Sequence, residues 1–208
     1  MQPAIAEPLH PVEIRVLGAL LEKEITTPEY YPLTVNALVN ACNQKSNRDP
    51  VVNYEEEDVQ QALAILRHKG LAVRISGAGH RVEKYGHSLG ERLNLGRRES
   101  AVLCVLMLRG PQTIGELRGR TERMYEFTEL AEVEHCLESL AAREPQPLVA
   151  SMPRGRWCHL LGNVPDPAPE AHGSRDLEDT DFEQRVAALE REVAELKEIL
   201  ASFRRQFE

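Results

Sequence analysis

Apolar residues in the first third of the chain recur at spacings of three and four, the period of one face of an α-helix. This pattern predicts helices over residues 12–24, 35–43 and 54–69. The side chains expected to face a core are Val16, Leu17, Leu20, Leu21, Val35, Leu38, Val39, Val59, Leu63 and Leu66. Two prolines in TTPEYYP separate the first helix from the second, because proline lacks the backbone donor that continues a helix.

The ends of these helices carry capping residues. Thr34 can cap the second helix, since a threonine oxygen accepts a hydrogen bond from a free N–H of the first turn. Asn53, followed three residues later by Glu56, predicts a capping box at the start of the third helix. Gly70, after the basic run RHK, is typical of a helix C-terminus.

A β-hairpin is predicted directly after the third helix. Leu71, Val73 and Ile75 alternate with small or polar residues, which indicates a strand with one buried face. The segment GAG, residues 77–79, turns the chain, and residues 80–86 return it as a second strand.

The same order of elements then occurs again. Apolar periods predict helices over 98–109 and 130–142, and Thr113 can cap a helix between them over IGELRGRT. A strand, a Pro-Arg-Gly turn and another strand follow in PLVASMPRGRWCHLLG. The positions expected to face inward are Val102, Leu103, Leu106, Met107, Val133, Leu137 and Leu140, and the last three lie 74 residues after Val59, Leu63 and Leu66.

Two copies of this unit favour two winged helix-turn-helix domains in tandem, over residues 1–94 and 95–163. Each core would be small, so we expect the domains to pack on each other. The alternative is two unrelated helical domains, but the matched hairpins favour the repeat. The predicted fold class is mainly α with small β-hairpins (α+β), extended by a C-terminal coiled-coil helix.

The coiled coil is predicted over residues 182–208, after a Pro/Gly/acid linker over 164–181. Apolar residues there are spaced by alternating threes and fours, which is a heptad seam. Oppositely charged flanking positions, Arg185 with Glu190 and Glu192 with Lys197, favour a parallel homodimer over a helix folded back on its own domain. The residues expected to form the dimer are Val186, Leu189, Val193, Leu196, Leu200 and Phe203.

The stretch LTVNALVNACNQKSNRDPVV, with the later LGRRESAVLCVLMLRGPQTIGELRGRTERMYEF, resembles the YceH family of bacterial proteins. The resemblance covers about residues 17–161. It implies tandem winged helices, in keeping with the repeat, and it brings no assigned activity and no catalytic residues.

Composition places the chain among ordinary globular proteins, with 42% hydrophobic and 28% charged residues. The net charge of −8 is divided evenly between residues 174–208 and the rest, so neither part has a strong basic excess. The longest apolar run, residues 101–108, is too short to span a membrane, and the N-terminus lacks the pattern of a secretion signal. With four widely spaced cysteines, we expect buried free thiols in a reducing cytoplasm.

No enzyme motif is recognisable: the sequence has no P-loop, no dinucleotide fingerprint and no nucleophile elbow. His80 and His87 could approach a metal, but we expect exposed hairpin residues instead, because a metal site usually needs a cluster with a third Cys, His or carboxylate ligand. The acids of residues 55–58 point in different directions on a helix and make a poor cation site. We therefore predict a protein that is not an enzyme and needs no cofactor.

Two functions remain open, DNA binding and protein binding as an adaptor, and the charge of the third helix bears on the choice between them. In a helix-turn-helix the early residues of that helix touch bases, yet here they are acids, which complement the helix dipole but meet phosphates with like charge. The neighbouring loop and hairpins are basic and could hold the DNA backbone. Their candidate residues are Lys45, Arg48, Arg74, His80, Arg81, Lys84, Arg154 and Arg156, with a second basic cluster at Arg97, Arg98, Arg118, Arg120 and Arg123. An adaptor that binds another protein through the same surfaces is the alternative.

Overall fold

The computed structural model describes residues 5, 7–75 and 82–163. The described residues belong to one compact unit. The predicted linker and coiled coil, with their six dimerisation residues, therefore lie outside the described residues, as do His80 and Arg81.

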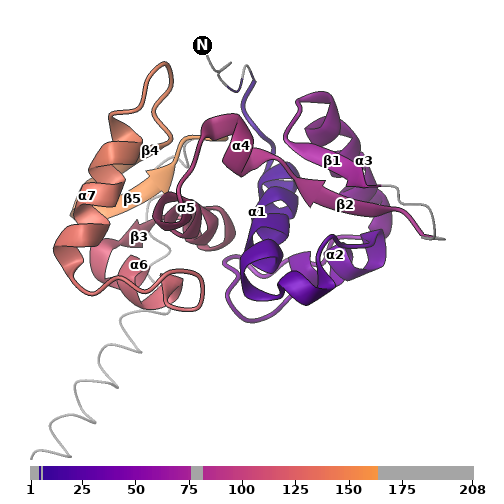
Figure 1. The fold of residues 1–208 in the computed structure, drawn as a ribbon, viewed down its shortest axis with the longest axis horizontal. Coiled ribbons are helices and arrows are strands. Elements are labelled where there is room, and N and C mark those ends of the chain that lie inside the picture. Colours follow the sequence, from indigo (N-terminus) through magenta and orange to yellow (C-terminus); the bar gives the residue numbers. More distant parts are fainter. Residues whose placement is uncertain (1–4, 6, 76–81, 164–208) are drawn as a thin grey trace, which may run out of the picture. The chain divides into compact units, whose positions relative to one another are not determined.

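The first repeat consists of three helices followed by a hairpin (Figure 1). The helices are α1 (Pro11–Thr26), α2 (Val35–Cys42) and α3 (Glu56–His68), with a short 3-10 turn at Pro28–Tyr30. Strands β1 (Ala72–Ile75) and β2 (Lys84–His87) pair antiparallel, and Leu33 adds an isolated antiparallel bridge to Tyr85 of β2. The predicted order of helices and strands is confirmed in this half.

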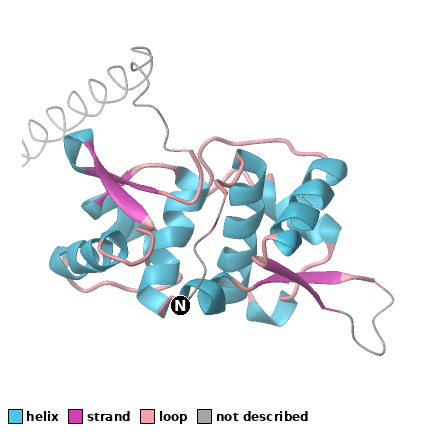
Figure 2. Ribbon diagram, turned by 90° about the horizontal axis from the view of Figure 1, so that it is seen from above, coloured by secondary structure: helices cyan, strands magenta, loops and turns pink. Residues whose placement is uncertain are grey.

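The second repeat has the same order (Figure 1), and both repeats combine helices with a small sheet (Figure 2). Helix α5 (Arg97–Arg109) leads through β3 (Gln112–Thr113) into α6 (Ile114–Thr121), and α7 (Leu130–Ala141) precedes β4 (Val149–Met152) and β5 (Arg156–His159). The sheet order β3-β5-β4 matches the first repeat, where the Leu33 bridge also pairs with the second strand of the hairpin. The chain is thus mixed α and β, and its described part holds seven α-helices and two small antiparallel sheets. The short helix α4 (Leu89–Leu93), between the repeats, was not predicted.

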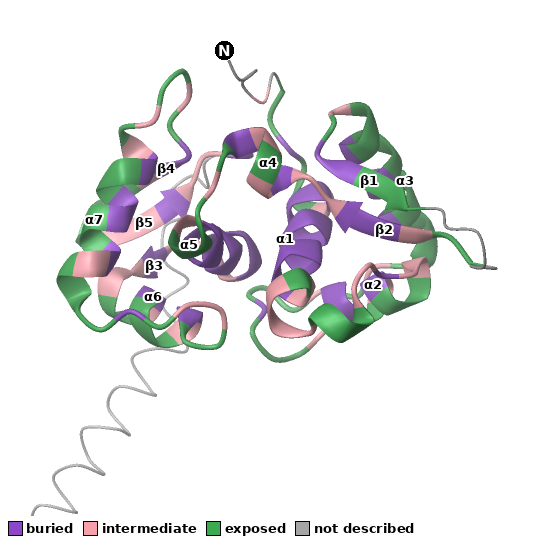
Figure 3. Cartoon of the chain, viewed as in Figure 1, coloured by how far each residue is buried: buried purple, intermediate pink, exposed green. Residues whose placement is uncertain are grey.

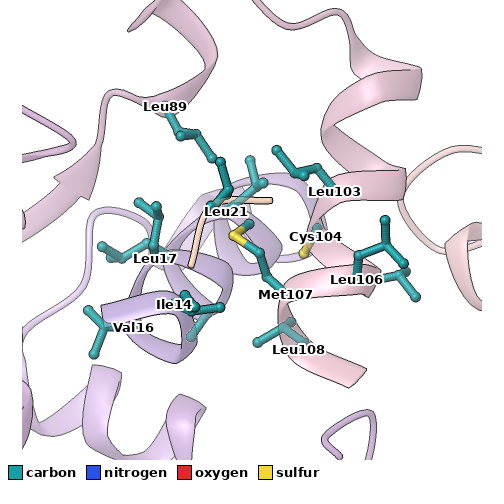
Figure 4. Packing of buried hydrophobic residues seen from close by; sticks show 14 of the residues in the cluster. Ile14, Val16, Leu17, Leu21, Leu89, Leu103, Cys104, Leu106, Met107 and Leu108 are labelled. Carbon is teal, nitrogen blue, oxygen red and sulfur yellow. The ribbon is translucent and has the colours of Figure 1, made fainter. Parts of the chain in front are cut away.

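Helices α1 and α5 form the centre of the unit and pack directly on each other (Figure 3). Residues 13–22 of α1 and 100–108 of α5 are buried without interruption, so both helices are covered on all sides. Leu17 and Leu21 of α1 share one apolar cluster with Leu103 and Met107 of α5 (Figure 4). The expectation that the two small cores pack together is confirmed.

A glycine allows this close approach. A Cβ atom built on Gly18 would lie 2.9 Å from Leu108 Cδ2 and 3.2 Å from Met107 Cβ. Across the same contact, the Sγ of Cys104 donates to the Gly18 carbonyl at 3.6 Å. A side chain at position 18 must therefore displace Leu108 or separate the two central helices.

Helix starts differ in how well the sequence predicted them. The Thr34 oxygen accepts from the N–H of Ala37 at 3.3 Å, and Thr113 exchanges hydrogen bonds with Glu116, so both threonine caps are confirmed. The Asn53 capping box is wrong: α3 begins two residues later, where the N–H of Glu55 donates to Asp58 Oδ2 at 2.9 Å. Four consecutive acids offer several capping choices, and spacing alone does not select among them.

The predicted buried face of β1 is also wrong. Leu71 is buried, but Val73 and Ile75 are 42% and 40% exposed, while Ala72 is buried in their place. Only the start of β1 reaches the core, whereas its partner strand β2 is buried at Tyr85 and Gly86. Alternation predicts a buried face only where another layer covers it.

Candidate nucleic-acid interface

The loop before α3 is fixed from within. The side-chain amide of Asn43 donates to the carbonyl of Tyr54 and accepts from its N–H, both at 2.8 Å. The guanidinium of Arg15 donates to the carbonyls of Cys42 and Pro50 at 3.2 and 2.6 Å. These bonds join both ends of the loop to the core, so its exposed side chains project from a rigid base.

Arg48 is the innermost residue of this loop. Its guanidinium is fully buried and forms a fork with Glu22, with Nη1–Oε1 at 3.1 Å and Nη2–Oε2 at 2.6 Å. Nη2 also donates to the carbonyl of Ala41 at 2.9 Å. Burial acts to raise the pKa of Glu22, but the hydrogen bonds and charge of Arg48 outweigh it and hold that pKa below its usual range.

The assignment of Arg48 to the exposed surface is therefore corrected. A guanidinium with no accessible surface, whose donors are used by a carboxylate and a carbonyl, cannot reach a phosphate. Lys45, three residues earlier, is exposed and has no hydrogen bond or ion pair to any other described residue.

The first hairpin carries one exposed ion pair. Arg74 Nη1 lies 2.6 Å from Glu83 Oε1, and the Tyr85 hydroxyl donates to Glu83 Oε2 at 2.8 Å. Lys84 is half-buried. Because an exposed ion pair contributes little to stability, Arg74 can exchange Glu83 for another anion at small cost.

The second hairpin holds Arg154 and Arg156 in different surroundings. Arg154 is exposed at the turn, where its φ of 63° lies in the left-handed region. Arg156 is half-buried, donates to the carbonyl of Pro111 at 2.9 Å and pairs with Glu116 at 3.1 Å. The structure thus leaves Arg154 at the surface and ties Arg156 to the start of α6.

Acids dominate the exposed faces of the third helix in each repeat. Glu56 and Glu57 are exposed in the first turn of α3, and Glu134 and Glu138 are exposed along α7. Glu56 accepts from the side-chain amide of Gln60 at 2.7 Å. The candidate basic residues accordingly surround these helices and do not lie on them.

A further group of arginines lies at the seam between the repeats. Arg109, Arg120 and Arg123 line one pocket with Asn47 of the loop, and Arg109 Nη1 donates to Asn47 Oδ1 at 2.9 Å. The sequence indicated a basic cluster at Arg120 and Arg123 but not Arg109. That arginine ends an apolar helix, and only the docking of the two repeats brings it to the loop.

Histidines and cysteines complete the inventory of reactive groups. The expectation that His87 is an exposed hairpin residue is wrong, because its side chain is only 4% exposed and its Nε2 lies 2.8 Å from Glu24 Oε2. Burial lowers the pKa of His87, although Glu24 acts in the opposite direction. Within residues 5, 7–75 and 82–163, no three His, Cys, Asp or Glu side chains are grouped to hold a metal. Cys42, Cys104, Cys136 and Cys158 are buried free thiols, as predicted, and burial raises the pKa of Cys42 to about 12.

No helix in the described part of the chain is both long enough and apolar enough to cross a membrane.

Comparison with known proteins gives consistent matches. Residues 9–156 match the family model described as a protein of unknown function, DUF480. A UPF0502 protein of Solibacter usitatus is 54% identical over 206 residues, covering 96% of this chain and 98% of the relative. UPF0502 proteins of Geotalea uraniireducens and Geobacter sulfurreducens are 50% and 49% identical, each also covering 96% of this chain and 98% of the relative.

Proposed function

Because the chain belongs to the DUF480 (UPF0502) family of uncharacterised bacterial proteins, whose descriptions name no activity, we propose its function from its geometry. We propose a protein without enzymatic activity that contacts the backbone of nucleic acids through its hairpins and the loop before α3. This proposal has three further parts. They are the likeness to the YceH family, the assignment of both repeats as winged helix-turn-helix domains, and a cytoplasmic location.

The shared topology of the two repeats carries the proposal. Each has three helices and a hairpin whose second strand pairs with one further segment, the isolated bridge at Leu33 in the first repeat and β3 in the second. Each also exposes one face of its third helix. In helix-turn-helix proteins that helix approaches the duplex while flanking elements hold phosphates. The exposed cations Lys45 and Arg154 lie on such flanking elements.

The contact set that supports backbone binding is smaller than the sequence predicted. It comprises Lys45, Arg74, Lys84 and Arg154, with His80 and Arg81 of the first hairpin outside the described residues. The acids at the start of α3 argue against base reading by that end of the helix, since phosphates repel carboxylates. The proposal is therefore binding with strong salt dependence and little sequence preference.

We expect the full-length protein to bind random duplex DNA with an affinity that falls steeply with salt. The double variant Lys45→Glu, Lys84→Glu should weaken binding and reduce the slope of log affinity against log salt by about 1 for each lost phosphate contact. Fluorescence anisotropy with a labelled duplex across a salt series measures both quantities.

Arg98→Glu is the matched control, because Arg98 is exposed at the start of α5 and is not one of the four residues in the proposed contact set. It changes the same charge and should leave the slope nearly unchanged. Absence of binding even in dilute salt would refute nucleic-acid contact.

A protein-binding adaptor is the second candidate, and the exposed acids of α3 and α7 favour it. Glu56, Glu57, Glu134 and Glu138 give both helices an acidic face that suits a basic partner. Under this function, the same binding experiment gives no signal for DNA.

We further propose that the chain forms a parallel homodimer through residues 182–208. Leu189→Glu with Leu196→Glu places charge on the heptad seam and should convert the full-length protein to a monomer. The control, Ala187→Glu with Ala194→Glu, adds the same charge off the seam and should stay dimeric. Light scattering after gel filtration gives the mass, and a monomeric parent protein would contradict the proposal.

A further inference from the structure

The pocket at the seam between the repeats is built from both of them. Its volume is about 40 Å³, and its walls come from the end of α1, the loop before α3, the end of α5 and the end of α6. Its polar lining residues are Glu22, Thr26, Asn47, Arg109, Arg120 and Arg123.

Arg109 lines this pocket and is held there by the loop before α3. Its Nη1 donates to Asn47 Oδ1, and its buried Nε has no hydrogen-bond partner among the described residues. Asn47 adopts a left-handed backbone with φ of 58°, which asparagine tolerates better than most residues. Burial, and then the nearby charge of Arg120, lower the pKa of Arg109, although Asp49 and Glu116 act in the opposite direction.

The carboxylates around the pocket are largely occupied. Glu22 is paired with Arg48. Glu116 lies 3.3 Å from Arg120, but it also pairs with Arg156 and caps α6 through Thr113.

Positive charge is in excess at the mouth of the pocket. Arg123 is exposed and has no hydrogen bond or ion pair to the rest of the described chain. Three arginines therefore converge where one shared carboxylate and Asp49 oppose them. Such crowding of like charge is relieved by an anion.

We propose that this seam pocket binds a phosphate group through Arg109, Arg120 and Arg123. Planar guanidinium groups bind phosphate oxygens through paired hydrogen bonds, and three of them line this one pocket. The volume suits a single phosphate group and excludes a buried nucleotide. The phosphate belongs either to a free small molecule or to a nucleic-acid backbone, and the site does not depend on DNA binding by the hairpins.

The position of the pocket has a thermodynamic consequence. Asn47 belongs to the first repeat and the three arginines to the second, so the site is complete only while the repeats are docked. A ligand that binds only this docked form stabilises it. Phosphate should therefore raise the melting temperature of the whole unit.

The test uses inorganic phosphate as the probe and the full-length chain. At constant ionic strength, we expect phosphate to bind saturably by calorimetry and to raise the melting temperature relative to chloride. Arg123→Ala should weaken phosphate binding about tenfold, the loss expected for one charged hydrogen bond, and Arg123→Lys should weaken it less. Arg67→Ala removes an exposed arginine of α3 that does not line the pocket, and it should leave phosphate affinity unchanged.

Binding experiments with duplex DNA distinguish a backbone phosphate from the phosphate of a free small molecule. If Arg123→Ala also weakens DNA binding, and phosphate competes with DNA at constant ionic strength, the pocket holds a backbone phosphate. The ligand is a free phosphorylated molecule if Arg123→Ala weakens phosphate binding but leaves DNA affinity unchanged, or if the parent protein does not bind DNA at all. Absence of saturable phosphate binding, or equal affinity in Arg123→Ala and the parent, overturns the proposal.

Discussion

Arg48→Ala should destabilise the folded chain by about 3–5 kcal/mol, the usual effect of removing one partner of a buried ion pair. The substitution leaves Glu22 with a buried charge and removes a donor from the carbonyl of Ala41. It also removes the fork that joins the middle of the loop before α3 to α1. Urea unfolding followed by circular dichroism measures the loss.

The pH dependence of this loss tests its cause. The pKa of Glu22 is depressed in the folded chain, so its pairing stabilises the fold above the unfolded pKa of about 4.5 and is lost as pH falls through the folded value. In Arg48→Ala the carboxylate of Glu22 is buried and unpaired, so it should instead favour the protonated form. The stability difference between parent and variant should therefore shrink as pH is lowered from 7 to below 4.

Lys45→Ala is the matched control, since Lys45 is an exposed cation of the same loop. It should change stability by less than about 0.5 kcal/mol, as surface substitutions usually do. An Arg48→Ala variant as stable as this control would mean that the Arg48–Glu22 fork does not hold the loop.

The sequence predicted those features of the fold that are encoded locally. Leu63 and Leu66, with their counterparts Leu137 and Leu140, follow helical spacing and are buried as expected. The threonine caps were also recognisable, because a cap and its partner lie within one turn. The helix α4 was missed because five residues are too few to show a period.

The features that the sequence did not predict depend on contacts between distant segments. Arg48 reads as a surface residue in a polar loop, and its burial requires Glu22, 26 residues away on another element. Val73 and Ile75 alternate like residues of a covered strand, but no second layer lies over them. One feature of the sequence does indicate the docking of α1 on α5. Residues 101–108 are apolar without interruption, and a helix that is apolar all round is buried.

Gly18→Leu should test that docking, with an expected destabilisation of about 1–3 kcal/mol, the range for overpacking a tight core. The new side chain would begin 2.9–3.2 Å from Leu108 and Met107 and must separate α1 from α5. Gly18→Ala should be milder, because alanine favours a helix by about 1 kcal/mol over glycine and this gain opposes the steric loss.

Gly119→Ala in α6 is the control of opposite sign. A Cβ at Gly119 would meet nothing within 4 Å, so only the helix preference acts and the fold should gain up to about 1 kcal/mol. Urea unfolding of the three variants gives the order Gly119→Ala, Gly18→Ala, Gly18→Leu from most to least stable. If Gly18→Leu were as stable as the parent, the central helices would have to be looser than their interdigitated side chains indicate. The two repeats would then behave as separate domains, and a phosphate site at their seam would lose its scaffold.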